Sequence, residues 1–180
     1  MFKVSDIYTA APKSSALTPV EEKVFEIFKC KNILYQRVET DEAISMEDCK
    51  EINKVLDVDM VKTLFLCNRQ KTSFFLLVTT ADKQIEAKAL SSKLGVSRLS
   101  FAPEELMEQY LGVKRGAATI LGAVIDDDDY IQIVVDQEVA QLPWYGCSTG
   151  RTTSYIKLST NDILNVFLPS IRHKAKIIAL

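Results

Sequence analysis

Two apolar runs separated by a short polar turn constrain the fold more than any other part of this sequence. Residues 61–67 and 72–79 form the runs, and residues 68–71 form the turn between them. This spacing predicts a β-hairpin. Because residues 74–78 are apolar at every position, the second strand is expected to lie inside a sheet that is covered on both faces.

Two capped helices precede this hairpin in the sequence. Thr18 and Ser45 are suitable N-caps, and each is followed three residues later by an acid, Glu21 or Asp48, as in a capping box. Pro19 fits the first helical position after Thr18. Both helices are therefore expected to begin at these caps.

The second half of the chain alternates between helices and strands. Helices are expected at residues 85–94 and 103–111, each ended by a glycine, and at 162–167 after a cap at Thr160. Strands are expected at residues 33–38, 98–101, 131–135 and 155–158, and a loop from Gly116 is expected to enter a strand at Gly122. This order predicts an α+β fold with a mixed, mostly antiparallel sheet surrounded by helices.

The length of 180 residues predicts one folded domain. We expect an N-terminal arm at 1–17, the domain at 18–168 and a C-terminal tail at 169–180. The sequence has neither a signal peptide nor a run of 18 apolar residues, so a cytoplasmic protein without a membrane span is expected. A net charge of −2 excludes a chain-wide basic surface for nucleic acid but leaves a local basic groove open, and no DNA partner is expected.

A single histidine, His173, restricts the chemistry of the chain. A Ser-His-Asp site or a histidine-ligated zinc site would have to use it, and the sequence argues against both. The four cysteines show no C-x-x-C spacing and are expected to be free thiols. We therefore expect no metal and no cofactor, and an enzyme of this composition would use lysine, carboxylates, hydroxyls, backbone amides and water.

Residues 126–129 are four consecutive aspartates. A calcium loop of the EF-hand type needs oxygen ligands at alternate positions, a glycine at the sixth and a terminal glutamate, and none of these is present. A solvated hairpin turn is therefore expected here.

Three segments allow two interpretations each. Lys62, inside an apolar run, lies either on a solvent face or in a pocket as a partly desolvated ammonium. Residues 112–122 lack a nucleotide-binding motif and form either an ordinary loop or a set of amides for an anion or a carbonyl. Residues 148–154, rich in hydroxyls, form either a polar turn or a site for a polar ligand.

Several segments together resemble one family. Over residues 18–167 the chain is similar to the YbaK and prolyl-tRNA-synthetase-associated editing domains. The similarity is carried by residues 35–39, 45–48, 62–66, 74–78, 81–96, 111–122, 134–136, 146–151 and 158–164. Each segment is weak alone, and their order and spacing make the match specific.

The resemblance implies a mixed α/β sheet fold and a trans-editing hydrolase that deacylates mischarged tRNA, such as alanyl- or cysteinyl-tRNA(Pro), without a metal. It implies catalytic roles for Lys62, Gly116 and Asp136. The substrate-binding residues expected with it are Tyr35, Thr119, Gly122, Ser148, Gly150 and Arg151. Expected partners are mischarged tRNA and prolyl-tRNA synthetase, with the chain a monomer or a homodimer.

Two departures from the family pattern keep other functions open. Ile120 stands where the family usually has proline, and Ser148-Thr149 stands where alanine-specific relatives have a His-Pro pair. The alternative is a non-catalytic module of the same fold that binds tRNA or an aminoacyl group. A structural or regulatory protein that acts through an apolar surface is a third interpretation.

Overall fold

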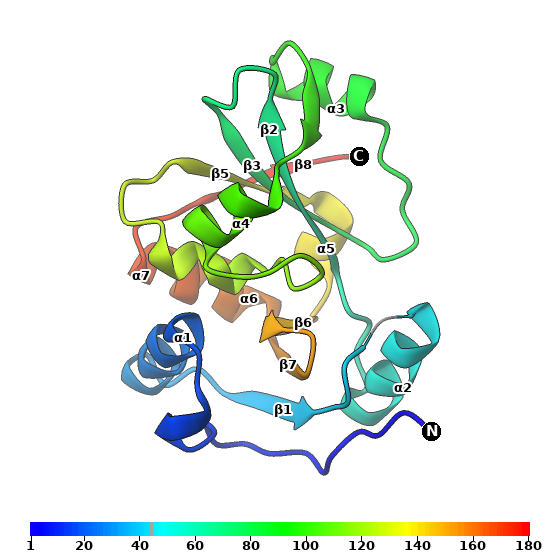
Figure 1. Cartoon of the computed structure of the whole chain (residues 1–180), viewed down its shortest axis with the longest axis vertical. Coiled ribbons are helices and arrows are strands. Elements are labelled where there is room, and N and C mark those ends of the chain that lie inside the picture. The colour runs from blue at the N-terminus through cyan, green and yellow to red at the C-terminus, as the bar shows by residue number, and fades with distance from the viewer. Residues whose placement is uncertain (44) are drawn as a thin grey trace.

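β3 (Phe74–Thr79) lies at the centre of a five-stranded mixed sheet in the computed structural model, which describes residues 1–43 and 45–180. The strand order is β4 (Leu99–Phe101), β2 (Lys62–Asn68), β3, β5 (Ile131–Asp136) and β8 (Ala175–Ile178). β2 is antiparallel to β3 and β4, whereas β5 is parallel to β3 and β8. Figure 1 shows a second, antiparallel sheet below it, in the order β1 (Tyr35–Glu39), β7 (Ser154–Ser159) and β6 (Trp144–Arg151).

The hairpin predicted at residues 61–79 is present, with Lys62 opposite Thr79. Every residue of β3 is buried. Its side chains alternate between two hydrophobic cores, with Leu76 in one and Leu77 in the other. The expectation of an inner strand covered on both faces is confirmed.

Four of the predicted helices are present as α1 (Pro19–Cys30), α2 (Met46–Leu56), α3 (Ala87–Leu94) and α4 (Glu104–Leu111). α1 and α2 begin at capping boxes, in which Thr18 and Ser45 exchange hydrogen bonds with the acid three residues later. α3 and α4 end at Gly95 and Gly112, whose φ angles of 69° and 64° favour glycine.

Gly122 does not lie in the predicted strand but in a 3-10 helix, η2 (Ile120–Ile125). This apolar segment is almost wholly buried and packs against α1 and α4 instead of pairing with a sheet. A Cβ at Gly122 would lie 2.8 Å from the Leu111 carbonyl oxygen, so the glycine allows η2 and α4 to approach closely.

β6 takes up the first part of the hydroxyl-rich segment, which is therefore strand as far as Arg151 and turn only at residues 152–153. The strand buries Tyr145, Cys147 and Thr149 against the core and pairs with β7. Just before it, a short helix absent from the prediction, α5 (Gln137–Gln141), follows β5 directly.

Both ends of the chain are attached to sheets. The last helical segment comprises α6 (Thr160–Asp162), η3 (Ile163–Phe167) and α7 (Leu168–Ser170), and its N-cap is Ser159 rather than the predicted Thr160. The segment set apart as a tail contains β8, which completes the large sheet beside β5. At the other end, Tyr8 and Arg37 of β1 exchange backbone hydrogen bonds, and η1 (Ser14–Ala16) leads into α1. Within residues 1–43 and 45–180, no helix has the length and apolar character needed to cross a membrane.

Candidate functional site

A cleft of about 710 Å³ is lined by residues from both sheets. Its walls come from the start of α2, from β2, from the segment joining β4 to α4, from the loop after α4, and from β6 and β7. The lining residues with polar or charged side chains are Ser45, Cys49, Thr63, Glu104, Arg115, Cys147, Ser148 and Tyr155. The volume lies within the range of about 300–1,000 Å³ that is usual for small-ligand sites.

The loop between α4 and η2 forms one wall of this cleft. Gly116 has a φ of 89°, and a Cβ there would meet only Thr152 Cγ2 at 3.6 Å, so the position needs glycine for its backbone conformation rather than for space. Gly116 and Ala118 line the cleft, and neither amide N–H donates a hydrogen bond within the described part of the chain. Both amides therefore lack a hydrogen-bond partner in that part of the chain.

Ser148 on β6 lies beside the same loop. Its hydroxyl donates a hydrogen bond to the Ala117 carbonyl oxygen at 3.4 Å, so two predicted site residues, Gly116 and Ser148, share one cleft. Burial raises the pKa of the neighbouring Cys147 thiol to about 12, and a hydrogen bond with Thr119 offsets this only in part. Cys147 therefore remains a thiol at neutral pH and is a poor nucleophile.

The titratable groups around the cleft limit its chemistry. Glu104 is the one carboxylate and Arg115 the one cation among the described lining residues. Burial, with smaller contributions from Cys49 and Asp48, raises the pKa of Tyr155 to about 12, so its phenol keeps its proton. The sequence did not single out Glu104, because an acid in the first turn of a helix is explained by the helix dipole alone.

Lys62 and Asp136 lie together elsewhere, where β2 begins and β5 ends. Thr79, opposite Lys62, donates a hydrogen bond to Asp136 at 3.1 Å. The Lys83 Nζ lies 2.6 Å from the Asp136 carboxylate, and the Lys62 Nζ donates a hydrogen bond to the Lys83 carbonyl oxygen. Neither Lys62 nor Asp136 lines the cleft, although Thr63 next to Lys62 does.

The contacts of Asp136 indicate that it stabilises the fold, by binding Lys83, Thr79 and the start of α5. Burial alone would raise the pKa of its carboxyl group, but hydrogen bonds from Lys83, from the Glu138 backbone N–H and from Thr79 outweigh burial and lower the pKa. The Glu138 contact caps α5. The catalytic role of Asp136 rests on the family resemblance alone.

The other predicted substrate-binding residues also lie outside the cleft lining. The Tyr35 ring packs against the rings of Phe25 and Phe28, with 5.4 Å between ring centroids in both pairs. Burial raises the pKa of the Tyr35 phenol, although the charge of Arg37 acts in the opposite direction. Thr119 is buried and caps η2. Gly122 packs against α4, as described above, and Gly150 has a φ of 104°.

Arg151 is paired rather than free. Its Nε lies 2.9 Å from Glu21 Oε1, and the same oxygen accepts a hydrogen bond from the Thr149 hydroxyl at 2.6 Å. The other Glu21 oxygen accepts from the Thr18 backbone N–H. The fully buried Glu21 thus fastens the start of α1 to β6, and substrate binding by Arg151 stays a prediction.

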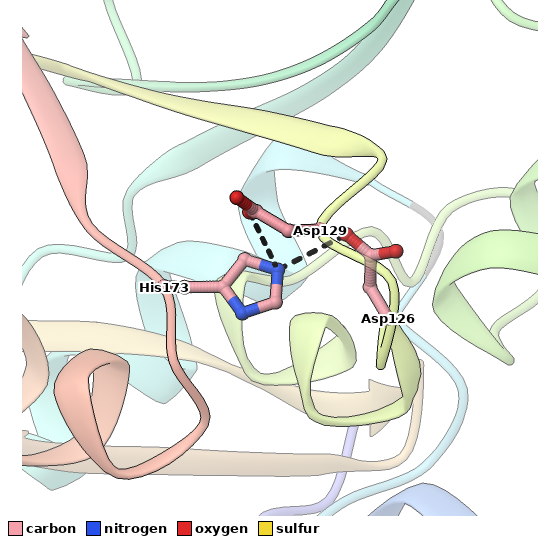
Figure 2. Close-up of side chains that lie close together, drawn as sticks. All are labelled: Asp126, Asp129 and His173. Atoms are coloured by element: carbon pink, nitrogen blue, oxygen red, sulfur yellow. Dashed lines mark hydrogen bonds and ion pairs between the residues drawn. The ribbon is translucent and has the colours of Figure 1, made fainter.

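The four aspartates at 126–129 connect η2 to β5 and do not form a hairpin turn. Asp127 and Asp128 are exposed as predicted, but the prediction is wrong for Asp126, which is buried. Figure 2 shows the reason: His173, far along the chain, lies against Asp126 and Asp129. None of the three lines the cleft.

Comparison with known proteins places this chain in one family. The family described as "Aminoacyl-tRNA editing domain" matches residues 40–166, more than half of the chain. "Prolyl-tRNA editing protein ProX" of Acetoanaerobium sticklandii is 28% identical over 132 residues, covering 73% of this chain and 80% of that protein. "Prolyl-tRNA synthetase associated domain-containing protein 1" of Danio rerio is 28% identical over 127 residues, covering 69% and 68%.

One solved structure matches almost the whole length of the chain. It is described as a candidate trans-editing enzyme for prolyl-tRNA synthetase, and it superposes with a TM-score of 0.66 over 92% of this chain and 98% of its own. The sequence identity of 14% limits this likeness to the fold. The predicted α+β fold is confirmed.

Proposed function

Since this chain belongs to the aminoacyl-tRNA editing domain family, we propose that it hydrolyses the ester bond of mischarged aminoacyl-tRNA in trans, with alanyl- or cysteinyl-tRNA(Pro) as its substrate. Similarity to a protein named for prolyl-tRNA editing supports this choice of tRNA. In this proposal the protein acts in the cytoplasm, as a monomer or homodimer, and serves prolyl-tRNA synthetase.

The free amide N–H groups of Gly116 and Ala118 at the cleft carry the proposal. Water attacks the ester carbonyl carbon, whose oxygen becomes an oxyanion that these amides stabilise. The bond to the ribose oxygen then breaks, and that oxygen takes up the proton released by the water. Losing one such donor typically costs about 10²–10³ in rate.

The proposed reaction needs no covalent intermediate, because an aminoacyl ester is already activated. The neighbouring ribose hydroxyl of the tRNA helps to activate the water, and Glu104 is the carboxylate that the cleft offers as a second proton acceptor. We propose that neither a metal nor a cofactor takes part. Cys147, whose thiol has a raised pKa, lines the cleft and does not act as a nucleophile in this proposal.

Lys62 and Asp136 stay in the proposal on the strength of the resemblance. Lys62 would bind a substrate phosphate or ester oxygen after its Nζ leaves the Lys83 carbonyl oxygen, and Asp136 would hold Lys83 in place. Substrate binding by Tyr35, Thr119, Gly122, Gly150 and Arg151, which lie outside the cleft lining, is likewise proposed from the resemblance alone.

A non-catalytic module that binds tRNA or an aminoacyl group is the second candidate. The lack of an imidazole among the described residues of the cleft favours it, as does Ile120 at the position of the family's proline.

A deacylation panel with alanyl-, cysteinyl-, seryl- and prolyl-tRNA distinguishes these two functions. The hydrolase proposal predicts turnover of the alanyl or cysteinyl ester, while correctly charged prolyl-tRNA is spared. If the protein binds all four aminoacyl-tRNAs with comparable affinity but hydrolyses none of their ester bonds faster than buffer alone, the result would contradict hydrolysis and favour the binding module.

A further inference from the structure

Both ring nitrogens of His173 face oxygen atoms. Nδ1 lies 2.8 Å from the Ile171 carbonyl oxygen, whereas Nε2 lies 3.0 Å from Asp126 Oδ2 and 3.6 Å from Asp129 Oδ1. The side chains of His173 and Asp126 are 2% and 1% exposed. Figure 2 shows the two carboxylates converging on the same ring nitrogen.

This arrangement favours a proton or a metal ion at Nε2. A carbonyl oxygen only accepts hydrogen bonds, so Nδ1 carries a proton and donates it to Ile171. In a neutral ring Nε2 then has a lone pair, which would face two carboxylates, of which the nearer, Asp126, is shielded from water. Asp126 also accepts hydrogen bonds from the backbone N–H groups of Tyr130 and Ile131 at 3.1 and 2.9 Å, so its oxygens are placed as acceptors. A proton or a metal ion between these groups removes the repulsion.

We propose that Asp126, Asp129 and His173 bind a divalent transition-metal ion, for which zinc is the best match. Zinc takes imidazole nitrogen and carboxylate oxygen at about 2.0–2.2 Å, and two such ligands on a tetrahedral ion lie about 3.3 Å apart. The observed Nε2–oxygen separations of 3.0 and 3.6 Å bracket that value. All three ligand atoms lie within 4.8 Å of one another.

Two further features favour a metal over a proton. A metal-bound histidine usually donates its second N–H to a carbonyl or carboxylate oxygen, as His173 does to Ile171. A proton on Nε2 would need only the nearer acceptor, Asp126, yet Asp129 also points to this nitrogen. Asp129 is 70% exposed, so water can reach the fourth coordination position.

The proposed metal would act on the fold and not on the reaction. It would join the turn before β5 to the residues between α7 and β8. The two strands that follow these segments, β5 and β8, pair in parallel. None of its ligands lines the cleft, so metal-free hydrolysis and a structural metal are compatible.

The single histidine makes the test direct, provided that the protein carries no histidine tag. Zinc is added to chelator-treated protein while the imidazole nitrogens are followed by ¹⁵N NMR and the thermal midpoint is measured. We expect one equivalent to bind, the Nε2 resonance to shift to a metal-bound position while Nδ1 keeps its proton, and the midpoint to rise.

A matched pair of variants locates the binding. Asp129→Asn changes an exposed ligand and should weaken zinc binding at least about tenfold. Loss of a residue that only hydrogen-bonds to a metal ligand already lowers metal affinity about 10–100-fold. Asp128→Asn removes the same charge from the same run and should leave binding unchanged. His173→Gln should abolish the zinc-dependent rise, and Asp129→Asn carries the test if that variant does not fold.

Two results would overturn the proposal. If the ¹⁵N spectrum shows that Nε2 of His173 stays protonated in the presence of zinc, a proton and not a metal ion lies between the ring and the carboxylates. Zinc affinity equal in the wild type and in Asp129→Asn would place the metal elsewhere, for example on the free thiols.

Discussion

The Ser148 hydroxyl on β6 donates a hydrogen bond to the Ala117 carbonyl oxygen, which ties this strand to the loop of Gly116. A change at position 148 therefore alters the cleft where the acyl group is proposed to bind. We predict that Ser148→His lowers turnover of the cysteinyl ester relative to the alanyl ester, because the larger ring leaves less room. Ser148→Ala should weaken any preference for a polar side chain.

The measurement for Ser148 is the ratio of deacylation rates for the two esters on the same tRNA. A pocket contact of this size is worth about 1–3 kcal/mol, so the ratio should change by about tenfold or more. A ratio that neither substitution moves would place Ser148 outside the acyl pocket.

Lys62 tests the role that the resemblance implies against the contact that the structure shows. We predict that Lys62→Met lowers kcat/KM for deacylation at least about tenfold, as for a charge-stabilising group, while the thermal midpoint stays near the wild-type value. Lys83→Met is the control, because it breaks the ion pair with Asp136 and should lower the midpoint. If Lys62→Met turns over the substrate at the wild-type rate, Lys62 has no catalytic role, and its function is limited to the hydrogen bond with the Lys83 carbonyl oxygen.

Asp136 should make the stability of the fold sensitive to acid. Its pKa is lower in the folded state than the value of about 3.9 expected in the unfolded chain. Its contribution is therefore complete above about pH 4 and is lost as the pH falls through the folded-state pKa, because the unfolded chain takes up the proton first. Asp136→Asn should be less stable at neutral pH and should lose part of this acid dependence. Parallel acid dependences in denaturant unfolding of the two proteins would contradict the assignment.

Arg115 is expected to contact tRNA phosphate, because it is exposed and lines the cleft. Each neutralised phosphate adds about −0.9 to the slope of log affinity against log salt for a duplex, and about −0.7 for a single strand. Arg115→Gln should weaken tRNA binding and make this slope shallower by about one contact. Arg69→Gln changes an exposed arginine on the β2–β3 turn and should leave the slope unchanged. Identical slopes for wild type and Arg115→Gln would remove Arg115 from the interface.

Features set by neighbouring residues could be predicted from the sequence. The capping boxes at Thr18 and Ser45 and the helix ends at Gly95 and Gly112 depend on contacts within a few residues. The inner position of β3 follows from its uninterrupted apolar run. Gly116 and Ser148 were singled out by the family pattern, and the structure places them on one cleft.

Features set by distant parts of the chain could not be predicted. Asp126 is buried because His173, 47 residues later, pairs with it, and Glu21 is satisfied by Arg151, 130 residues later. The short stretch at 175–178, apolar except for Lys176, forms a strand along the edge that β5 offers. The hydrogen bond of Lys62 to the Lys83 carbonyl oxygen likewise depends on how residues 80–84 fold back.

The central claim, that the Gly116 loop supplies the amides for hydrolysis, is tested most directly by comparing Gly116→Ala with Gly95→Ala. Both glycines have positive φ, 89° and 69°, and neither has close neighbours, so each substitution carries a similar backbone penalty of about 1–2 kcal/mol. The measurement is kcat/KM on mischarged tRNA at a temperature where both variants are folded. Alanine keeps the amide N–H but disfavours a φ of 89°, so the Gly116 backbone shifts and the amides are misplaced. The account therefore predicts a loss for Gly116→Ala that approaches the cost of one oxyanion donor, about 10²-fold, and wild-type turnover for Gly95→Ala. Equal activity of the two variants would contradict it.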